Sequence, residues 1–173
     1  GNWLGIRKLT YKDPNQFTRD WEFVFRKHAK GAVAIIAILM PSNKIILVSQ
    51  FRPPANAEVL EFPAGLLDKD GEDPEKTAIR ELKEETGYTG KLVKIFPPSF
   101  SSPGLSSEQV HLAIVNVDEN CPSNQNVVQS PDEGEFIKTF IVPRRKLLDF
   151  ILKSEKKGIK IDSKVISFAL SGA

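Results

Sequence analysis

Three glutamates, Glu81, Glu84 and Glu85, follow directly after Arg80 in this chain of 173 residues. In a helix they would occupy positions i, i+3 and i+4 and would share one face. Such a group repels itself and meets the negative end of the helix dipole, each at roughly 0.2–0.5 kcal/mol. A hard divalent cation would reverse both penalties, because Mg²⁺ and Mn²⁺ prefer carboxylate oxygens. The competing interpretation is a solvated surface helix in which Arg80 pairs with Glu84.

The residues around these glutamates predict a helix over residues 74–86. Asp73 suits the N-cap, Pro74 suits the first helical position, and Gly87 suits a left-handed end. The stripe expected to be buried lies beside the glutamates and consists of Ala78, Ile79, Leu82 and Thr86. The carboxylates are therefore expected to converge on one side of a short helix.

The stretch from Gly65 to Tyr88, GLLDKDGEDPEKTAIRELKEETGY, resembles the Nudix box. That pattern runs Gly, five residues, Glu, seven residues, Arg-Glu, an aliphatic residue, any residue, Glu-Glu, any residue, Gly and an aliphatic or aromatic residue. Every position from Glu72 onward fits, which is far more specific than a lone glycine motif. One departure is that six residues, and not five, separate Gly65 from Glu72. The additional residue falls in an expected turn and leaves the helix register unchanged.

Several segments outside the box look like the ADP-ribose and nucleoside-diphosphate-sugar pyrophosphatases of the Nudix family. They are QFRPP (50–54), EFPAGLLD (61–68), ETGYTG (85–90), SPGLSSE (102–108), GEFIKTFIVP (134–143) and VISFAL (165–170). The resemblance implies Mg²⁺-dependent hydrolysis of ADP-ribose to AMP and ribose 5-phosphate.

Two alternatives stay open. One is a hydrolase of other nucleoside diphosphate derivatives, such as ADP-sugars, GDP-sugars or oxidised nucleoside diphosphates. The other is a non-catalytic Nudix fold that senses ADP-ribose, although a sensor could dispense with glutamates that destabilise the helix without metal. An RNA-cap hydrolase is disfavoured, because the sequence has no extended basic face with interleaved aromatic residues.

The resemblance also implies how metal is held. Ala64 would offer its backbone carbonyl, Glu81 and Glu85 would ligate through their side chains, and Glu84 would assist. Two or three Mg²⁺ ions are expected at the site, with Mn²⁺ as a possible substitute, and Arg80 is expected to hold a carboxylate in place. Such cations lower the pKa of bound water and clamp phosphoryl oxygens, which is what water attack on a pyrophosphate needs.

An acidic stretch late in the chain, DEGEF, offers candidates for a general base. Spacing alone does not choose among Asp132, Glu133 and Glu135, and a solvated acidic turn is the structural alternative. The resemblance favours Glu135, because relatives carry a glutamate on this loop before a strand that begins with Phe. Whether Glu135 acts as base or as a further metal ligand stays open.

The resemblance further implies residues that bind substrate. Trp3 and Trp21 match a pair that sandwiches adenine, and stacking on an aromatic face contributes roughly 1–3 kcal/mol per base. The complete expected set is Trp3, Trp21, Glu22, Arg26, Arg52 and Leu66. Relatives often carry an acidic residue where this chain has Ser102, which leaves recognition of the terminal ribose open.

The expected fold is α/β (α+β), a Nudix αβα sandwich with a mixed sheet, preceded by an amino-terminal antiparallel β-hairpin. Residues 1–30 are assigned to the hairpin segment and residues 31–173 to the Nudix hydrolase domain. Strands are predicted at 3–11, 17–27, 32–40, 44–51, 58–62, 91–96, 110–117 and 135–142, and further helices at 144–156 and 162–170.

Composition narrows the remaining possibilities. A net charge of +2 is too small to argue for nucleic acid, and the lone Cys121 excludes an internal disulfide. No apolar run is long enough for a bilayer, so a soluble protein of the cytoplasm is expected, with the nucleus as the alternative. The resemblance implies a homodimer with exchanged amino-terminal strands.

Overall fold

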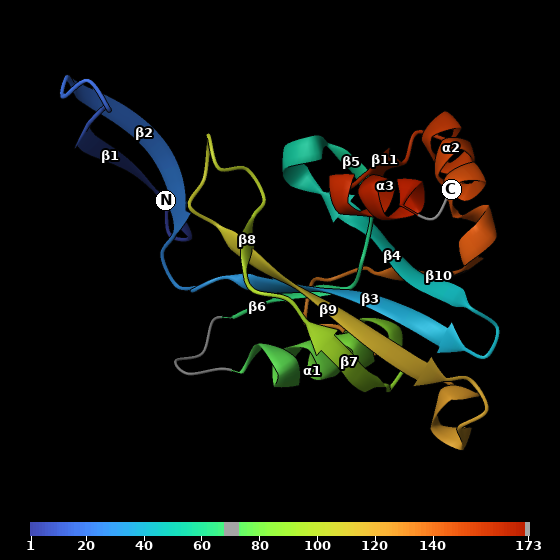
Figure 1. Ribbon diagram of the computed structural model, residues 1–173. Helices are drawn as coiled ribbons and strands as arrows, with labels where there is room; N and C mark the ends of the chain where they lie inside the picture. Colours follow the sequence, from blue (N-terminus) through green and yellow to red (C-terminus); the bar gives the residue numbers. More distant parts are fainter. Residues whose placement is uncertain (68–72, 172–173) are drawn as a thin grey trace.

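A computed structural model describes residues 1–67 and 73–171, arranged as a mixed α+β fold (Figure 1). Glu72 and the four residues before it, 68–71, fall outside the described residues. The strands are β1 Leu4–Lys12, β2 Thr18–Arg26, β3 Ala32–Met40, β4 Lys44–Arg52, β5 Ala57–Glu61, β6 Ala64–Leu66, β7 Lys91–Ile95, β8 Ser99–Phe100, β9 Gln109–Asp118, β10 Lys138–Pro143 and β11 Lys160–Ile161. The helices are α1 Pro74–Thr86, α2 Leu147–Lys156 and α3 Ser163–Leu170, with 3₁₀ turns at Pro53–Ala55, Pro122–Asn124 and Arg144–Lys146.

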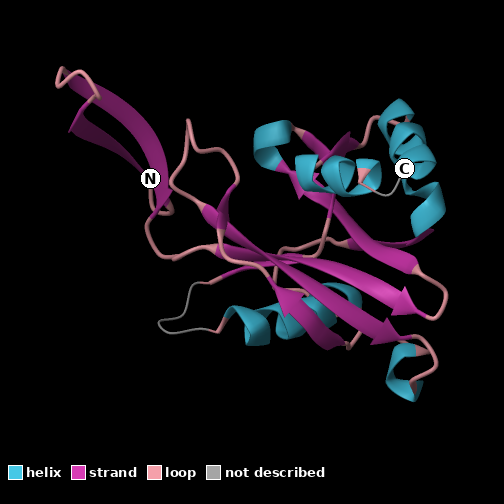
Figure 2. Ribbon diagram, in the orientation of Figure 1, coloured by secondary structure: helices cyan, strands magenta, loops and turns pink. Residues whose placement is uncertain are grey.

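Helices cover both faces of one mixed sheet. The strand order is β11-β5-β4-β3-β9-β7, and β10, β6 and β8 pair with β4, β3 and β9. Strand β3 pairs parallel with β9 and antiparallel with β4, so the sheet is mixed as predicted. Helix α1 lies on one face of the sheet, and α2 and α3 lie on the other (Figure 2). This is the expected αβα sandwich.

The alternation of side chains along β3 supplies a core to each face. Val33, Ile35 and Ala37 pack with the α1 residues Ala78 and Leu82, all fully buried. The intervening positions of β3, with β4 and β5, pack against the second pair of helices through Ile36, Ile38, Ile45, Leu47, Leu60, Leu147, Ile151 and Val165. A strand buried on both faces must be apolar throughout, which explains the continuous run AVAIIAILM.

The amino-terminal hairpin forms a sheet of its own. Strands β1 and β2 pair antiparallel over their full length, and the hairpin projects from the body (Figure 1). Its backbone touches the body at one loop, where Val24 N–H donates to Leu105 O at 2.8 Å and Ser107 N–H donates to Val24 O at 3.1 Å. A lone two-stranded hairpin is marginal in water, so this segment needs further cover.

Helix α1 begins and ends where the local signals place it. The Asp73 side chain accepts a hydrogen bond from Glu75 N–H, and Pro74 opens the helix. Gly87 closes it at φ 77°, a left-handed conformation that favours glycine.

Two predicted elements need correction. The strand predicted at 135–142 begins only at Lys138, because the chain turns between Asp132 and Gly134 before it meets β4. The helix predicted from residue 144 opens with a 3₁₀ turn, and α2 itself starts at Leu147. Three short strands, β6, β8 and β11, were not predicted. None of the described helices is both long and apolar enough to cross a membrane.

Candidate active site

Glu85 is a buried carboxylate held against the start of β6. Its residue is 4% exposed, and its Oε2 accepts a hydrogen bond from Ala64 N–H at 3.1 Å. Burial raises the pKa of Glu85 to about 8, the Ala64 bond and Arg52 oppose the increase, and the charges of Glu81 and Glu135 add to it. Near neutral pH this carboxylate is therefore short of compensating positive charge.

Glu81 lies one helical turn earlier and crosses directly over Gly65. A Cβ built on Gly65 would overlap the Glu81 carboxylate, so this close approach requires glycine. Burial raises the pKa of Glu81 to about 7, Arg80 opposes the increase, and Glu84 and Glu135 add to it. The first glycine of the motif, Gly65, therefore leaves room for the side chain of the motif glutamate Glu81.

Arg80 forms ion pairs with both Glu84 and Glu81. One guanidinium nitrogen, Nη1, lies 2.6 Å from Glu84 Oε2 and 3.0 Å from Glu81 Oε1. The carboxylates of Glu81 and Glu84 are therefore both held by protein donors. Among the residues that the structure describes, no three acidic, histidine or cysteine side chains lie close enough together to hold a metal ion.

The chemistry of this group nevertheless suits a divalent cation. Glu85 is buried and Glu81 is partly buried one helical turn away, and burial raises the pKa of both carboxyl groups. Carboxylate oxygens are the ligands that Mg²⁺ and Mn²⁺ prefer, and a cation would supply the missing charge. The residues present fit such an ion.

The acidic loop brings one of its three candidates into this electrostatic neighbourhood. Glu135 N–H donates to Asp132 O at 3.1 Å, and Gly134 adopts φ 88°, so residues 132–135 form a tight turn. Glu135 is among the charges that raise the pKa of Glu81 and Glu85, and neither Asp132 nor Glu133 is. Of the three candidates, Glu135 is therefore the one whose charge acts on Glu81 and Glu85.

Two arginines expected to bind substrate lie in different parts of the molecule, each on an acidic partner. Arg52 Nε is 2.8 Å from Glu61 Oε2, beside the buried site, and its charge opposes the raised pKa of Glu85. Arg26 Nε, at the base of the hairpin, is 2.6 Å from Glu108 Oε1. Leu66 ends β6 and is 37% exposed, next to the glycine beneath Glu81.

The two tryptophans are exposed and far apart within one chain. Trp3 is 75% exposed and Trp21 is 49% exposed, and the Trp21 indole donates to Gly104 O at 3.2 Å. Trp3 O accepts a hydrogen bond from Lys27 N–H, and Trp21 lies in β2 six residues before Lys27, so roughly 20 Å of strand separates the two tryptophans. One base cannot be sandwiched between the two indoles of a single chain.

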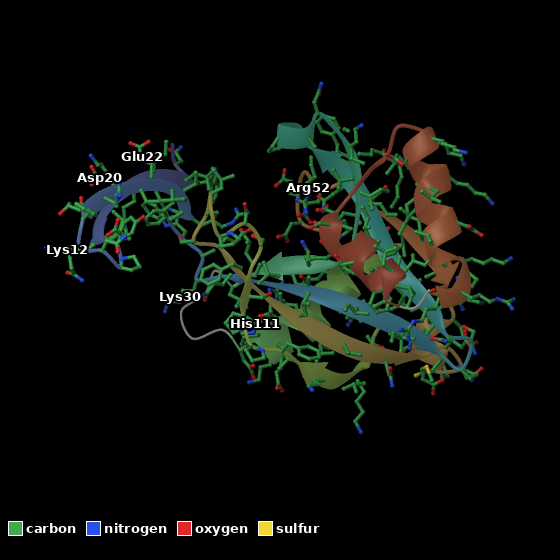
Figure 3. All side chains as sticks on the ribbon, turned by 45° about the horizontal axis from the view of Figure 1, so that its top comes forward. Lys12, Asp20, Glu22, Lys30, Arg52 and His111 are labelled. Carbon is green, nitrogen blue, oxygen red and sulfur yellow. The ribbon has the colours of Figure 1, made fainter. Side chains whose placement is uncertain are left out.

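Figure 3 places Glu22 on the outlying hairpin and Arg52 on the body. The sequence-predicted residues therefore form two groups, one around α1 and one on the hairpin. Sequence reasoning did not single out Glu61 and Glu108, the partners of the two arginines. Their only signal is that both lie in segments that resemble the pyrophosphatases, EFPAGLLD and SPGLSSE.

Similarity to known proteins extends over nearly the whole chain. The NUDIX domain profile matches residues 28–162. The chain is 39% identical over 175 residues to a Saccharomyces cerevisiae protein named ADP-ribose pyrophosphatase, covering 96% of this chain and 75% of that one. It is 37% identical to a Mus musculus ADP-sugar pyrophosphatase, covering 99% and 82%. It is also 38% identical to a Bacillus subtilis ADP-ribose pyrophosphatase, covering 72% and 64%.

Proposed function

Because this chain belongs to the NUDIX family, we propose that it is a Nudix pyrophosphatase that hydrolyses ADP-ribose to AMP and ribose 5-phosphate. The observation that carries the proposal is the pair of motif glutamates beside β6, with Glu85 buried against Ala64 N–H and Glu81 lying over Gly65. The substrate is supported by relatives named for ADP-ribose and ADP-sugars across nearly the full chain. ADP-sugars are therefore the second candidate substrates.

Mg²⁺, with Mn²⁺ as a substitute, is the proposed cofactor, at two or three ions per site. Glu81, Glu85 and the Ala64 carbonyl would hold it, with Glu84 as a further oxygen ligand. Bound there, divalent ions acidify water and neutralise the charge of the diphosphate. Arg80 pairs with Glu81 and Glu84 and so holds their carboxylates toward the same side of α1.

The protein itself must accept the proton of the attacking water. We assign that role to Glu135, because its charge is felt by Glu81 and Glu85 and it sits on a solvent-exposed turn. A general base on a turn can reach a water beside the buried pair and then release the proton to solvent. Arg52, held by Glu61 next to Glu85, is placed to bind a phosphoryl oxygen.

The hairpin is proposed to hold the adenosine end of the substrate. Trp3 and Trp21 would stack on the base, Glu22 would contact its edge, Arg26 would contact phosphate, and Leu66 would line the path to the reacting centre. Since the two indoles of one chain lie roughly 20 Å apart along the hairpin, the sandwich requires the second tryptophan from a partner. We therefore propose a homodimer in which residues 1–30 act as an exchanged arm on the domain of residues 31–173.

The proposed function is tested by incubating the protein with Mg²⁺ and a panel of ADP-ribose, ADP-glucose and GDP-mannose, with products separated by chromatography. AMP and ribose 5-phosphate from ADP-ribose is the expected outcome. Preference for GDP-mannose would contradict the assigned substrate, and binding of ADP-ribose without turnover would identify a sensor. Glu85→Gln is the control, because it keeps the side-chain shape and removes the buried charge.

A further inference from the structure

The carboxyl end of α1 is covered by a distant segment, residues 127–130. Of the last four helix carbonyls, Lys83 O accepts from Gly87 N–H, Glu84 O accepts from Ser130 N–H at 2.8 Å, and Glu85 O accepts from Gln129 Nε2 at 2.5 Å. Helix ends leave such carbonyls without helical partners, so the segment supplies donors that the helix lacks. Residues 129 and 130 therefore hold the backbone of Glu84 and Glu85 through hydrogen bonds.

Gly87 shows how closely the segment approaches. A Cβ built there would lie 2.8 Å from Val128 N and 2.9 Å from the Val127 side chain. Both distances are too short for real atoms. The glycine therefore serves the left-handed helix end and also admits residues 127–130 against it.

The Gln129 amide also reaches the sheet. Its Nε2 donates to Thr139 Oγ1 at 2.8 Å in addition to Glu85 O, which uses both hydrogens of the amide. Thr139 belongs to β10 and pairs with Val48 of β4, so it is fixed to the central sheet. One side chain thus joins the helix that carries the glutamates to the strand that follows the acidic turn.

Residues 130–138 are bracketed between these two attachment points. The segment contains the turn 132–135 and Glu135, an exposed residue in no helix or strand. Its path is set by where it starts, on the α1 carbonyls, and by where it ends, on β10. The side chain of Gln129, just before this segment, hydrogen-bonds to both attachment points, Glu85 O on α1 and Thr139 on β10.

We propose that Gln129 is a positioning residue that holds the acidic turn, and with it Glu135, over the carboxylates of α1. The inference rests on the proposed function for its catalytic readout. Displacement of a reacting group by about 1 Å can reduce the rate on the order of 100-fold.

Gln129→Met tests the proposal, because it keeps the length of the side chain and removes both donated hydrogen bonds. We expect kcat for ADP-ribose at saturating Mg²⁺ to fall roughly 10- to 100-fold, with KM changed by less than about threefold. Thr139→Val removes only the bond to the sheet and should reduce kcat less. Gln125→Met is the matched control, since Gln125 is an exposed glutamine of the same polar stretch, and it should match the wild type.

A double-mutant cycle separates positioning from general destabilisation. In a Glu135→Gln background, Gln129→Met should reduce kcat by less than about threefold further, because the group it positions is already disabled. In a Trp21→Ala background its full effect should persist. An equal loss in both backgrounds, or an unchanged kcat in Gln129→Met, would overturn the proposal.

Hydrogen exchange keeps the inference testable if the wild type fails to turn over ADP-ribose. Gln129→Met should accelerate exchange of the hydrogen-bonded amides of Ser130 and Glu135 at least about tenfold, while the amides of β3 stay protected. If the exchange of these amides is unchanged, Gln129 does not hold the acidic turn, whatever the substrate is. If the wild type does not hydrolyse ADP-ribose but Gln129→Met still accelerates exchange, the role of Gln129 in holding the turn is supported and only the proposed function is contradicted.

Discussion

The two regions proposed to hold the two ends of the substrate differ in how much of their structure one chain supplies. Around α1 the key side chains are buried and have partners, with Glu85 on Ala64, Glu81 over Gly65 and Arg80 between two glutamates. On the hairpin, apolar side chains face solvent, including Trp3 at 75% and Ile6 at 78% exposure. Among the described residues, the side chains of the first region find partners within the chain, whereas the apolar side chains of the second remain exposed.

This difference teaches that reaction and recognition rest on different physical supports. The region around α1 is fixed by the core of the sandwich and by backbone hydrogen bonds at both ends of the helix. The hairpin is fixed by its own ladder and by the loop 102–107. Changes near α1 should therefore act on the rate, and changes on the hairpin should act on affinity.

The largest effect is expected from Glu85→Gln. Turnover at saturating Mg²⁺ should fall on the order of 1,000-fold, because a neutral amide cannot replace a carboxylate at a site of concentrated phosphate charge. The free energy of unfolding of the metal-free variant at pH 8 should equal or exceed that of the wild type, since the substitution removes a buried charge. Steady-state kinetics and urea unfolding measure the two quantities. Retention of activity would remove Glu85 from the reaction.

The second prediction concerns pH in the metal-free protein. The pKa of Glu85 rises from 4.5 to about 8 on folding, so the folded state binds more protons than the unfolded state between these values. The contribution of Glu85 to the free energy of unfolding should be greatest below pH 4.5. It should fall by about 2–4 kcal/mol as the pH rises toward 8. Urea midpoints at pH 5 and pH 8 with a chelator test the sign, and Glu85→Gln should flatten the difference. Saturating Mg²⁺ should restore most of the lost stability at pH 8.

The third prediction addresses the incomplete region. Trp3→Ala and Trp21→Ala should each raise KM for ADP-ribose roughly 10- to 100-fold with little change in kcat, since stacking contributes about 1–3 kcal/mol per base. Under the proposed exchange, a mixed dimer of the two variants regains one intact pair of tryptophans. Co-refolding them should restore about a quarter of the wild-type sites. If mixing restores no high-affinity site, the two tryptophans do not meet across a dimer.

The smallest effect is expected from Gly65→Ala. The new methyl group would overlap the Glu81 carboxylate and push it aside, while the fold should tolerate the change because the overlapped atoms end a flexible side chain. We expect the Mg²⁺ affinity to fall about tenfold with the melting temperature nearly unchanged. Titration calorimetry with Mg²⁺ measures this. Gly104→Ala, at a glycine with open space around it, is the control and should leave the affinity unchanged.

Local signals in the sequence were enough for the parts of the fold that depend on neighbours in the chain. Helix α1 is confirmed from Pro74 to Thr86 because its cap, its proline and its closing glycine all act within a few residues. The buried strands 32–40 and 44–51 are confirmed because each carries a continuous apolar run, AVAIIAILM and IILV, as a strand covered on both faces requires. The strand predicted from Glu135 was wrong at its start, because alternation cannot reveal where pairing with β4 begins.

Most of what surrounds the site depends on tertiary contacts and could not be predicted. The grip of Gln129 on Glu85 joins residues far apart in sequence, and nothing about an isolated glutamine indicates it. Strand β6 is three residues long, too short for any periodicity, yet it presents Ala64 to Glu85. The roles assigned to the site residues, and the dimer, stay predictions.

Helix α2 lies on the face of the sheet turned away from α1, behind its own apolar core. A cysteine introduced at exposed Lys156, near the end of this helix, would offer a handle for a fluorophore or for immobilisation on a sensor chip. The reacting surface of a tethered molecule would then point into solution, which makes single-molecule records of substrate capture feasible.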